Sequence, residues 1–350
     1  QTIQGTDDGS GNCTYGSAFV GPQNNLTVDL FIPSLPNGGA HIFTSSLFVG
    51  QTYRTQTDLA AAGIFEGGDG PTLTIEAGAT LAFETNSDFM IINRGSKVLA
   101  DGTLNNPITF TSVSDINGTV APEDVQQWGG IVINGFGVSN KCSYDGIRGD
   151  ANFQLTPGTE CSIEAEGSVG DDESQYGGDN DADSSGILRY VRVKHTGAQV
   201  ANGDELNGIS FGGVGNGTVI ENLQVYSTYD DGVEFFGGSV DVTNLVAVYV
   251  RDDSIDIEIN ESDVKVDTMR AGGAGGRRGT CSPDEGGLDS HRRARAVGDD
   301  PVDRLVVLDD GVDEGDDRLV LCLKSACTEA NVVDVLPKDE PPGVEHAPSP

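Results

Sequence analysis

The chain has 350 residues, of which 49 are glycine, and its 55 acidic and 20 basic side chains give a formal net charge of −35. So acidic a surface repels phosphate groups, which argues against nucleic acid and anionic lipid as partners. No apolar run of about 18 residues occurs, so we expect no transmembrane segment. The chain opens on Gln1 without the basic and apolar stretches of a signal peptide, as a mature exported protein would.

Short strands, rather than helices, dominate the predicted secondary structure. Residues 1–70 contain one helix-like stretch, TDLAAAGIF at 57–65, and we expect them to form an N-terminal cap and the first coil. Beyond residue 70, alternation of apolar and polar residues predicts a series of strands. They cover residues 72–84, 89–102, 107–113, 129–137, 187–197, 207–213, 218–227, 232–238 and 241–250.

An internal repeat lies at the end of this strand-rich part of the chain. IENLQVYSTYDDGVEFFGG at 220–238 aligns with VTNLVAVYVRDDSIDIEIN at 242–260 at a shift of 22 residues, and LNGISFGG at 206–213 aligns with DDGVEFFGG at a shift of 24. Repeats of this length, built from strands and tight turns, indicate a solenoid. We therefore predict an all-β fold, a right-handed parallel β-helix over residues 71–260, with about 22–24 residues per coil.

The composition changes near residue 260. All 22 aromatic residues precede it. RLVVLDD at 304–310, RLVLCLKS at 318–325 and NVVDVL at 331–336 are compatible with short strands, whereas the ending PKDEPPGVEHAPSP has the composition of a disordered tail. We expect residues 261–350 to form a separate, irregular C-terminal region with a disordered tail.

Motifs in residues 70–258 resemble, in order, those of a family of secreted bacterial parallel β-helix proteins without an assigned biochemical role. The motifs are GPTLTIEAGATLAFE, RGSKVLADGTLNNPITFTS, WGGIVINGFG, YGGDNDADSSGILRYVRVKHTG, DELNGISFGGVGNGTVIENLQV and YDDGVEFFGG followed by DDSID. The resemblance implies an exported β-helix at the bacterial surface and no particular reaction. IEINESDVKVDTMRAGG departs from the family pattern, and Cys13 is too far from the start for a lipid-modified N-terminus.

Two sets of carboxylates recur at the 22-residue interval. They are Asp230, Asp231 and Glu234, followed by Asp252, Asp253 and Asp256. Because one coil advances a β-helix by about 4.8 Å, we expect the two sets to stack about 5 Å apart. Such a stack fits a calcium site built from oxygen ligands, and it also fits turns in which Asp side chains cap their own backbone.

An enzymatic interpretation is also open. Polygalacturonases are β-helices with an Asp pair on one coil and another Asp on the next, and the candidate catalytic residues here would be Asp230, Asp231, Asp252 and Asp253. The histidine and Arg-x-Lys motif of those enzymes are missing nearby, since His195 lies about two coils earlier. A calcium-dependent lyase would need a basic residue, for which Arg251 is the candidate. Turn architecture and calcium are therefore favoured over catalysis.

Other residues offer weaker signals. Asp179, Asp181 and Asp183 alternate as in the first half of an EF-hand loop, but Tyr190 stands where the loop needs glutamate, so a looser calcium loop or a solvated acidic loop remains. Cysteine spacing permits two local disulfides, although spacing alone does not decide pairing. The pairs are Cys142 with Cys161 and Cys322 with Cys327. For the aromatic residues we favour packing over sugar binding. They are Trp128, Tyr226, Tyr229, Phe235, Phe236 and Tyr249.

Taken together, these features predict an exported structural or adhesive protein of the cell surface or extracellular space. The expected cofactor is calcium or none, and the expected interactions are self-association into a filament or lattice, or binding of surface glycans. The alternative is a polysaccharide hydrolase or lyase that uses the stacked aspartates.

Overall fold

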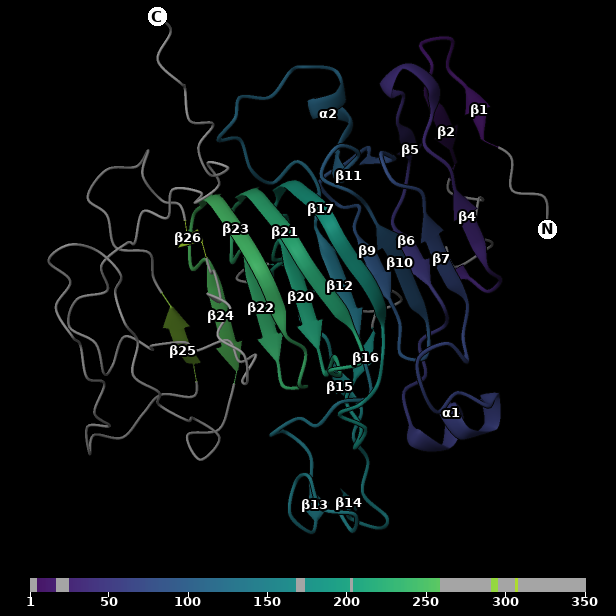
Figure 1. The fold of residues 1–350 in the computed structure, drawn as a ribbon, viewed down its shortest axis with the longest axis vertical. Coiled ribbons are helices and arrows are strands. Elements are labelled where there is room, and N and C mark those ends of the chain that lie inside the picture. The colour runs from purple at the N-terminus through teal and green to yellow at the C-terminus, as the bar shows by residue number, and fades with distance from the viewer. Residues whose placement is uncertain are drawn as a thin grey trace, which may run out of the picture.

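A computed structural model describes residues 5–16, 25–167, 174–201, 204–258, 291–294 and 306–307. The described chain is a parallel β-helix, as predicted (Figure 1). Each coil contributes strands to three faces. The first face contains β4 (Leu30–Ile32), β7 (Thr72–Ile75) and β10 (Lys97–Asp101). The second contains β1 (Thr6–Asp7), β2 (Cys13–Tyr15), β5 (His41–Phe43), β8 (Thr80–Phe83) and β11 (Ile108–Ser112).

Three long strands run over both of these faces, and a second sheet forms the third face. The long strands are β17 (Gly186–Thr196), β21 (Val219–Thr228) and β23 (Val242–Val250). The third face contains β3 (Asn25–Leu26), β6 (Leu47–Val49), β9 (Met90–Ile92), β12 (Ile131–Asn134), β20 (Ile209–Gly212), β22 (Val233–Phe236) and β24 (Ile255–Glu258). Strands β2 to β6 already take part in these faces, so coiling begins within residues 1–70, which were predicted to form the cap and the first coil.

Backbone bends at stacked positions turn the long strands from face to face. At the first corner the residues with positive φ are Tyr190 (49°), Asn222 (54°) and Asn244 (58°), and at the second corner they are His195 (62°), Ser227 (61°) and Tyr249 (56°). Asparagine tolerates this conformation better than most residues. Asn244 Nδ2 donates to Asn222 Oδ1 at 3.0 Å, so these two residues stack at an exposed corner.

Strand register confirms the repeat where the coils are shortest. Val233 pairs with Ile255, a shift of 22, and Ile209 pairs with Val233, a shift of 24. Earlier coils are longer, as the pairing of Val98 with Gly186 shows. Residues 113–130 and 135–185 leave this coil as two excursions. The spacing of 22–24 residues holds from β20 onward, and β3 also pairs with β6 at a shift of 23, from Asn25 to Phe48.

The remaining elements are short helices and hairpins in the connections between the coil strands. The helices are α1 (Gln56–Ala62), α2 (Val113–Ile116) and the 3-10 turn Pro36–Gly38. The hairpins are β13 (Tyr144–Asp145) with β14 (Gln154–Leu155), β15 (Ile163–Glu164) with β16 (Gln175–Tyr176), and β18 (Gln199–Ala201) with β19 (Asp204–Glu205). The β13–β14 hairpin projects away from the coils (Figure 1). None of the helices in the described residues is long and apolar enough to cross a membrane.

The structure describes only a small part of the predicted C-terminal region. Within residues 261–350 the structure describes only β25 (His291–Ala294), antiparallel to β24, and β26 (Val306–Val307), antiparallel to β23. Strand β26 lies within the predicted stretch 304–310. The other two predicted strands, the predicted tail and the pair Cys322–Cys327 lie outside the described residues.

Apolar side chains from each face stack in register inside the coils. One inward row on the first face runs through Ile75, Ala100, Leu188, Ile220 and Val242, all buried. Full burial of each of the larger side chains in this row stabilises the fold by roughly 1.5–3 kcal/mol. The predicted packing role of Trp128 is confirmed, since its side chain is fully buried, stacks on Phe83 with ring centroids 4.6 Å apart, and donates to the Lys194 carbonyl at 2.7 Å.

Candidate functional site: a stack of acidic residues at the second corner

A ladder of side chains joins successive coils where the second face turns into the third. We call Asn207, Asp231 and Asp253 the corner ladder. The backbone N–H of Asp231 donates to Asn207 Oδ1 at 3.1 Å, and that of Asp253 donates to Asp231 Oδ1 at 2.9 Å. The side chains of Asn207 and Asp231 thus each satisfy a donor of the next coil at a bend, where the sheet ladder is interrupted.

Next to the ladder, outward-facing side chains of the third face bring more carboxylates together. Ser210, Glu234 and Asp256 occupy one register row on β20, β22 and β24. Carboxylate oxygens of Asp231, Glu234 and Asp256 all lie within 4.8 Å of one another, and we call these three the buried acidic cluster. Their exposed fractions are 7%, 6% and 4%.

A second group overlaps the first and reaches solvent. Carboxylate oxygens of Asp230, Asp231 and Asp252 also lie within 4.8 Å of one another, and Asp230 and Asp252 are only half-buried. The predicted stacking of acidic residues at the 22-residue interval is therefore confirmed. Calcium binding by these carboxylates stays a prediction.

Asn207 connects the cluster to a residue that the sequence did not single out. Its Nδ2 donates to Glu234 Oε2 at 2.5 Å and to Ser210 Oγ at 3.1 Å, and lies 3.4 Å from Glu166 Oε2. Glu166 follows β15, inside the excursion 135–185. Its contact with Glu234 joins positions 68 residues apart, 234 minus 166, for which the short repeat offers no signal.

Burial dominates the electrostatics of this site. It raises the pKa of Asp231 to about 8; the N–H of Asp253 opposes the shift, and neighbouring Asp230, Asp256 and Asp253 add to it. Burial, followed by the neighbouring Glu166, raises the pKa of Glu234 to about 11. Without a cation, these two groups therefore hold protons at neutral pH, because several desolvated carboxylates this close cannot all ionise.

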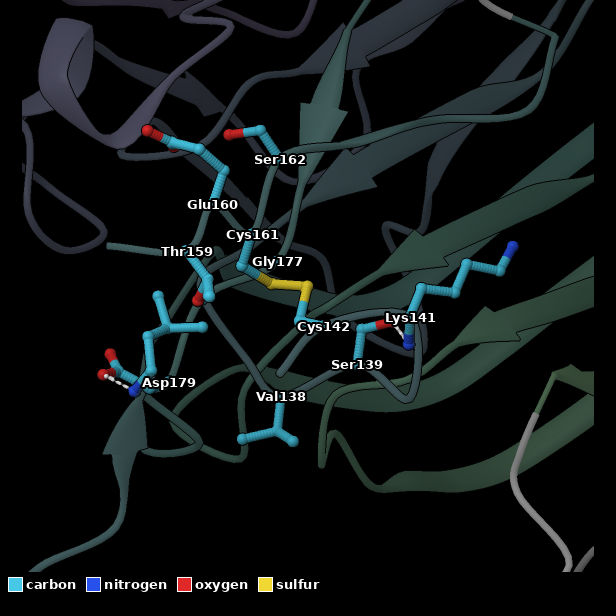
Figure 2. Close-up of a disulfide and its surroundings, with 12 residues drawn as sticks. Val138, Ser139, Lys141, Cys142, Thr159, Glu160, Cys161, Ser162, Gly177 and Asp179 are labelled. Atoms are coloured by element: carbon cyan, nitrogen blue, oxygen red, sulfur yellow. Dashed lines mark hydrogen bonds between the residues drawn. A yellow bond between two sulfur atoms is a disulfide. The ribbon is translucent and has the colours of Figure 1, made fainter. Parts of the chain in front are cut away.

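Part of the excursion 135–185 forms a cover over the outer side of the third face, beside the cluster. Its residues Ala165 and Tyr176 pack with Phe236, Val132 and Leu206 on the outer side of the third face. Strands β12 and β22 are consequently buried on both sides, which their alternating pattern did not predict. A disulfide between Cys142 and Cys161, the first of the two candidate pairs, closes the cover (Figure 2).

Arg94 ties this cover to the coils. Its Nη1 donates to the carbonyls of Cys161 at 3.0 Å and Gly177 at 2.8 Å, and its Nη2 donates to the carbonyl of Tyr53 at 2.9 Å and to Ser162 Oγ at 2.9 Å. Burial lowers the pKa of Arg94 to about 10, although nearby Glu160 opposes the shift, so the side chain remains charged at neutral pH.

The three alternating aspartates do not form one group. Asp183 accepts from the N–H of Gly67 at 2.7 Å and of Phe136 at 3.1 Å, and is buried. Asp181 forms an ion pair with Arg148, 2.5 Å between Nε and Oδ2. Asp179 accepts from the N–H of Leu155 at 2.9 Å (Figure 2). Each carboxylate thus fastens a different segment.

The basic residues considered for catalysis have other contacts. Arg251 is exposed, and its Nη2 donates to the Glu123 carbonyl at 3.2 Å. His195 is 2% exposed; its Nδ1 lies 2.6 Å from the Asp124 carbonyl and its Nε2 lies 3.5 Å from Asp115. Both belong to the packing of the excursion 113–130 rather than to the acidic cluster.

Most aromatic candidates pack against protein. Phe235 and Phe236 are buried, and Tyr226 meets Tyr249 edge-on with centroids 5.4 Å apart. The packing prediction is confirmed for these four residues. Tyr229 is 40% exposed.

The fold and the corner together define an acidic parallel β-helix protein with stacked carboxylates between its coils. Residues 49–261 match a family model described as "Pectate-lyase like beta helix domain". The match spans more than half of the chain, so the protein belongs to this family. No curated protein and no solved structure matches the chain. The predicted resemblance to β-helix proteins is confirmed, and the narrower resemblance to secreted surface proteins stays a prediction.

Proposed function

We propose that the protein is an exported structural or adhesive component of the bacterial surface or extracellular matrix. In this proposal the stacked carboxylates at the second corner hold neighbouring coils together around calcium and perform no reaction. The observation that carries the proposal is the corner ladder, in which Asp231 already accepts the backbone N–H of Asp253. A carboxylate engaged in this way serves the turn between two coils.

The burial of the cluster also favours this role. A hydrolase must place its two carboxylates on either side of a glycosidic bond. Asp231, Glu234 and Asp256 are at most 7% exposed, and Glu166 of the excursion 135–185 contacts Glu234. A polysaccharide would therefore need a rearrangement of the protein to reach these three carboxylates.

The donor set suits calcium. Calcium takes six to eight oxygen ligands at about 2.3–2.6 Å, and carboxylates are its usual protein partners. The buried cluster offers carboxylates of Asp231, Glu234 and Asp256, while half-buried Asp230 and Asp252 leave room for water ligands. A divalent cation would offset the repulsion that otherwise keeps protons on these groups.

Export and attachment rest on further features. The Cys142–Cys161 disulfide suits an oxidising compartment such as the periplasm or the cell exterior. Stacked coils form a rigid body with long faces, suited to self-association into a filament or lattice or to binding of surface glycans. These remain the partners we propose.

Calcium-dependent melting without turnover tests the proposal. We expect calcium to raise the melting temperature above that in EDTA, with less effect from magnesium, and we expect no product from neutral or acidic polysaccharides. A melting temperature that does not change with calcium would contradict the proposed calcium site. Release of oligosaccharides by the wild type would overturn the non-catalytic role.

A polysaccharide hydrolase or lyase is the second candidate. It is favoured by the half-buried pair Asp230 and Asp252, whose carboxylates meet near solvent. Its test is digestion of polygalacturonate by the wild type and by the Asp230→Asn and Asp252→Asn variants. Product formed by the wild type and lost in both variants would establish this candidate.

A further inference from the structure

A polar cavity lies at the third corner, where the third face returns to the first. Its volume is about 680 Å³, and its walls come from the turns between β3 and β4, between β6 and β7, and between β9 and β10. The acidic stack occupies the second corner, so the two sites are separate. The volume falls within the range of about 300–1,000 Å³ usual for small-molecule sites.

We propose that this cavity binds one or two rings of an uncharged glycan. The inference rests on the adhesive function proposed above and assigns it a site and a ligand class. The lining combines hydrogen-bonding groups of Asp29, Gln51 and Asp69 with the apolar surfaces of Val28 and Tyr53. A sugar ring needs both kinds of surface, because it presents hydroxyl groups at its edge and C–H groups on its faces.

The rim carboxylates are held in fixed orientations. Asp29 Oδ1 accepts from the N–H of Thr72 at 2.9 Å. Asp69 Oδ2 accepts from the N–H of Phe65 at 2.8 Å and of Glu66 at 3.0 Å. These bonds fix carboxylates that remain exposed at the cavity, where they can accept hydrogen bonds from sugar hydroxyls without a large ordering cost.

The floor carries an independent sign of a missing hydrogen-bonding partner. Ser96 is 1% exposed, lines the cavity, and its Oγ has no hydrogen-bond partner. It occupies the place where a side chain on Gly50 or Gly70 would begin, 2.0 Å and 2.9 Å from an ideal Cβ. A buried hydroxyl without a partner is uncommon in folded proteins, so the cavity wall at Ser96 is a place where the fold leaves a polar group unsatisfied.

The negative charge of the cavity and of the chain favours an uncharged ligand over an anionic one. Uronic acids, sialic acids and sulfated sugars would meet Asp29 and Asp69 on a chain of net charge −35. Arg94 also lines the cavity, but its two Nη atoms donate to Tyr53, Ser162, Cys161 and Gly177. Its guanidinium therefore serves the fold and not an anionic group of a ligand.

A glycan array probed with the full chain tests the site. Neutral and acidic glycans are compared for the wild type, for Val28→Trp, which fills the cavity from an exposed position, and for the matched control Leu104→Trp. Val28 is 46% and Leu104 is 74% exposed, so neither change should lower the melting temperature much. Gln51→Ala, with exposed Gln154→Ala as its control, provides a second pair.

We expect the wild type to bind at least one neutral glycan, with affinity reduced at least tenfold by Val28→Trp and Gln51→Ala and unchanged in the controls. Absence of neutral binding, preference for acidic glycans, or equal binding by Val28→Trp and the wild type would overturn the site. If the chain adheres to bacterial polysaccharide and Val28→Trp does so equally, the site fails and the adhesive role stands. Cleavage of an arrayed glycan would instead refute the proposed function.

Discussion

Replacing Asp231 by asparagine should stabilise the protein at alkaline pH when no calcium is present. Burial raises the pKa of Asp231 to about 8, whereas an unfolded aspartate titrates near 3.9. Between these values the folded state holds a proton that the unfolded state has released. Stability is therefore present below the unfolded pKa and declines as the pH rises through this window, until the folded group also ionises.

The size of the effect follows from the shift. About four pKa units at 1.36 kcal/mol each give an upper bound of about 5 kcal/mol at pH 8. Asparagine has no proton to lose, and Asn207 shows that asparagine serves at this position, because it accepts the N–H of Asp231 at 3.1 Å one coil earlier. We expect Asp231→Asn to gain about 2–5 kcal/mol in EDTA at pH 8, a rise of about 5–15 °C for a domain of this size.

Thermal melting in EDTA at pH 4 and pH 8 measures this difference. The variant should match the wild type at pH 4 and exceed it at pH 8, while an exposed control, Asp150→Asn, should follow the wild type throughout. In calcium the order should reverse, because the variant lacks a ligand. Equal pH slopes for variant and wild type, or a less stable variant at pH 8 in EDTA, would refute the reasoning.

Three further substitutions probe the coils and their cover. Trp128→Ala removes a fully buried ring stacked on Phe83 and should cost about 3–5 kcal/mol in urea unfolding; a loss below 1 kcal/mol would contradict the packing described. Arg94→Met removes four hydrogen bonds, three of them to the cover, and should cost about 3 kcal/mol, with faster proteolysis between residues 142 and 167; an unchanged digestion pattern would argue against the tether. Asn244 adopts φ of 58°, so Asn244→Val should cost about 1–2 kcal/mol while Asn244→Gly costs less, and equal melting temperatures would exclude backbone strain.

Local periodicity predicted the coils that contain no long insertions. The alignment of 220–238 with 242–260 predicted the strand register, since each residue pairs with its counterpart 22 positions later. It also predicted that Asp231 and Asp253 would stack. In these coils the sequence distance and the spatial distance are linked by a single turn of the solenoid.

The contacts made by the long insertions could not be predicted from the repeat. Glu166 reaches Glu234, and Arg94 reaches Cys161, only because the excursion 135–185 folds back over the third face. Spacing predicts which residues share a coil but not where a 51-residue excursion, 135 to 185 inclusive, will pack. The alternating aspartates 179–183 suggested one ligand set, yet Asp183 caps backbone N–H groups of distant Gly67 and Phe136 instead.

Calorimetric titration of calcium tests the central claim most directly. The chain, stripped of metal, is titrated with calcium alone and compared with Glu234→Gln and with the exposed control Asp150→Asn. The account predicts a saturable calcium site in the wild type and the control that is weakened at least tenfold in Glu234→Gln. No binding heat in several buffers, or unchanged affinity in Glu234→Gln, would contradict a cation held between the coils by the buried acidic cluster.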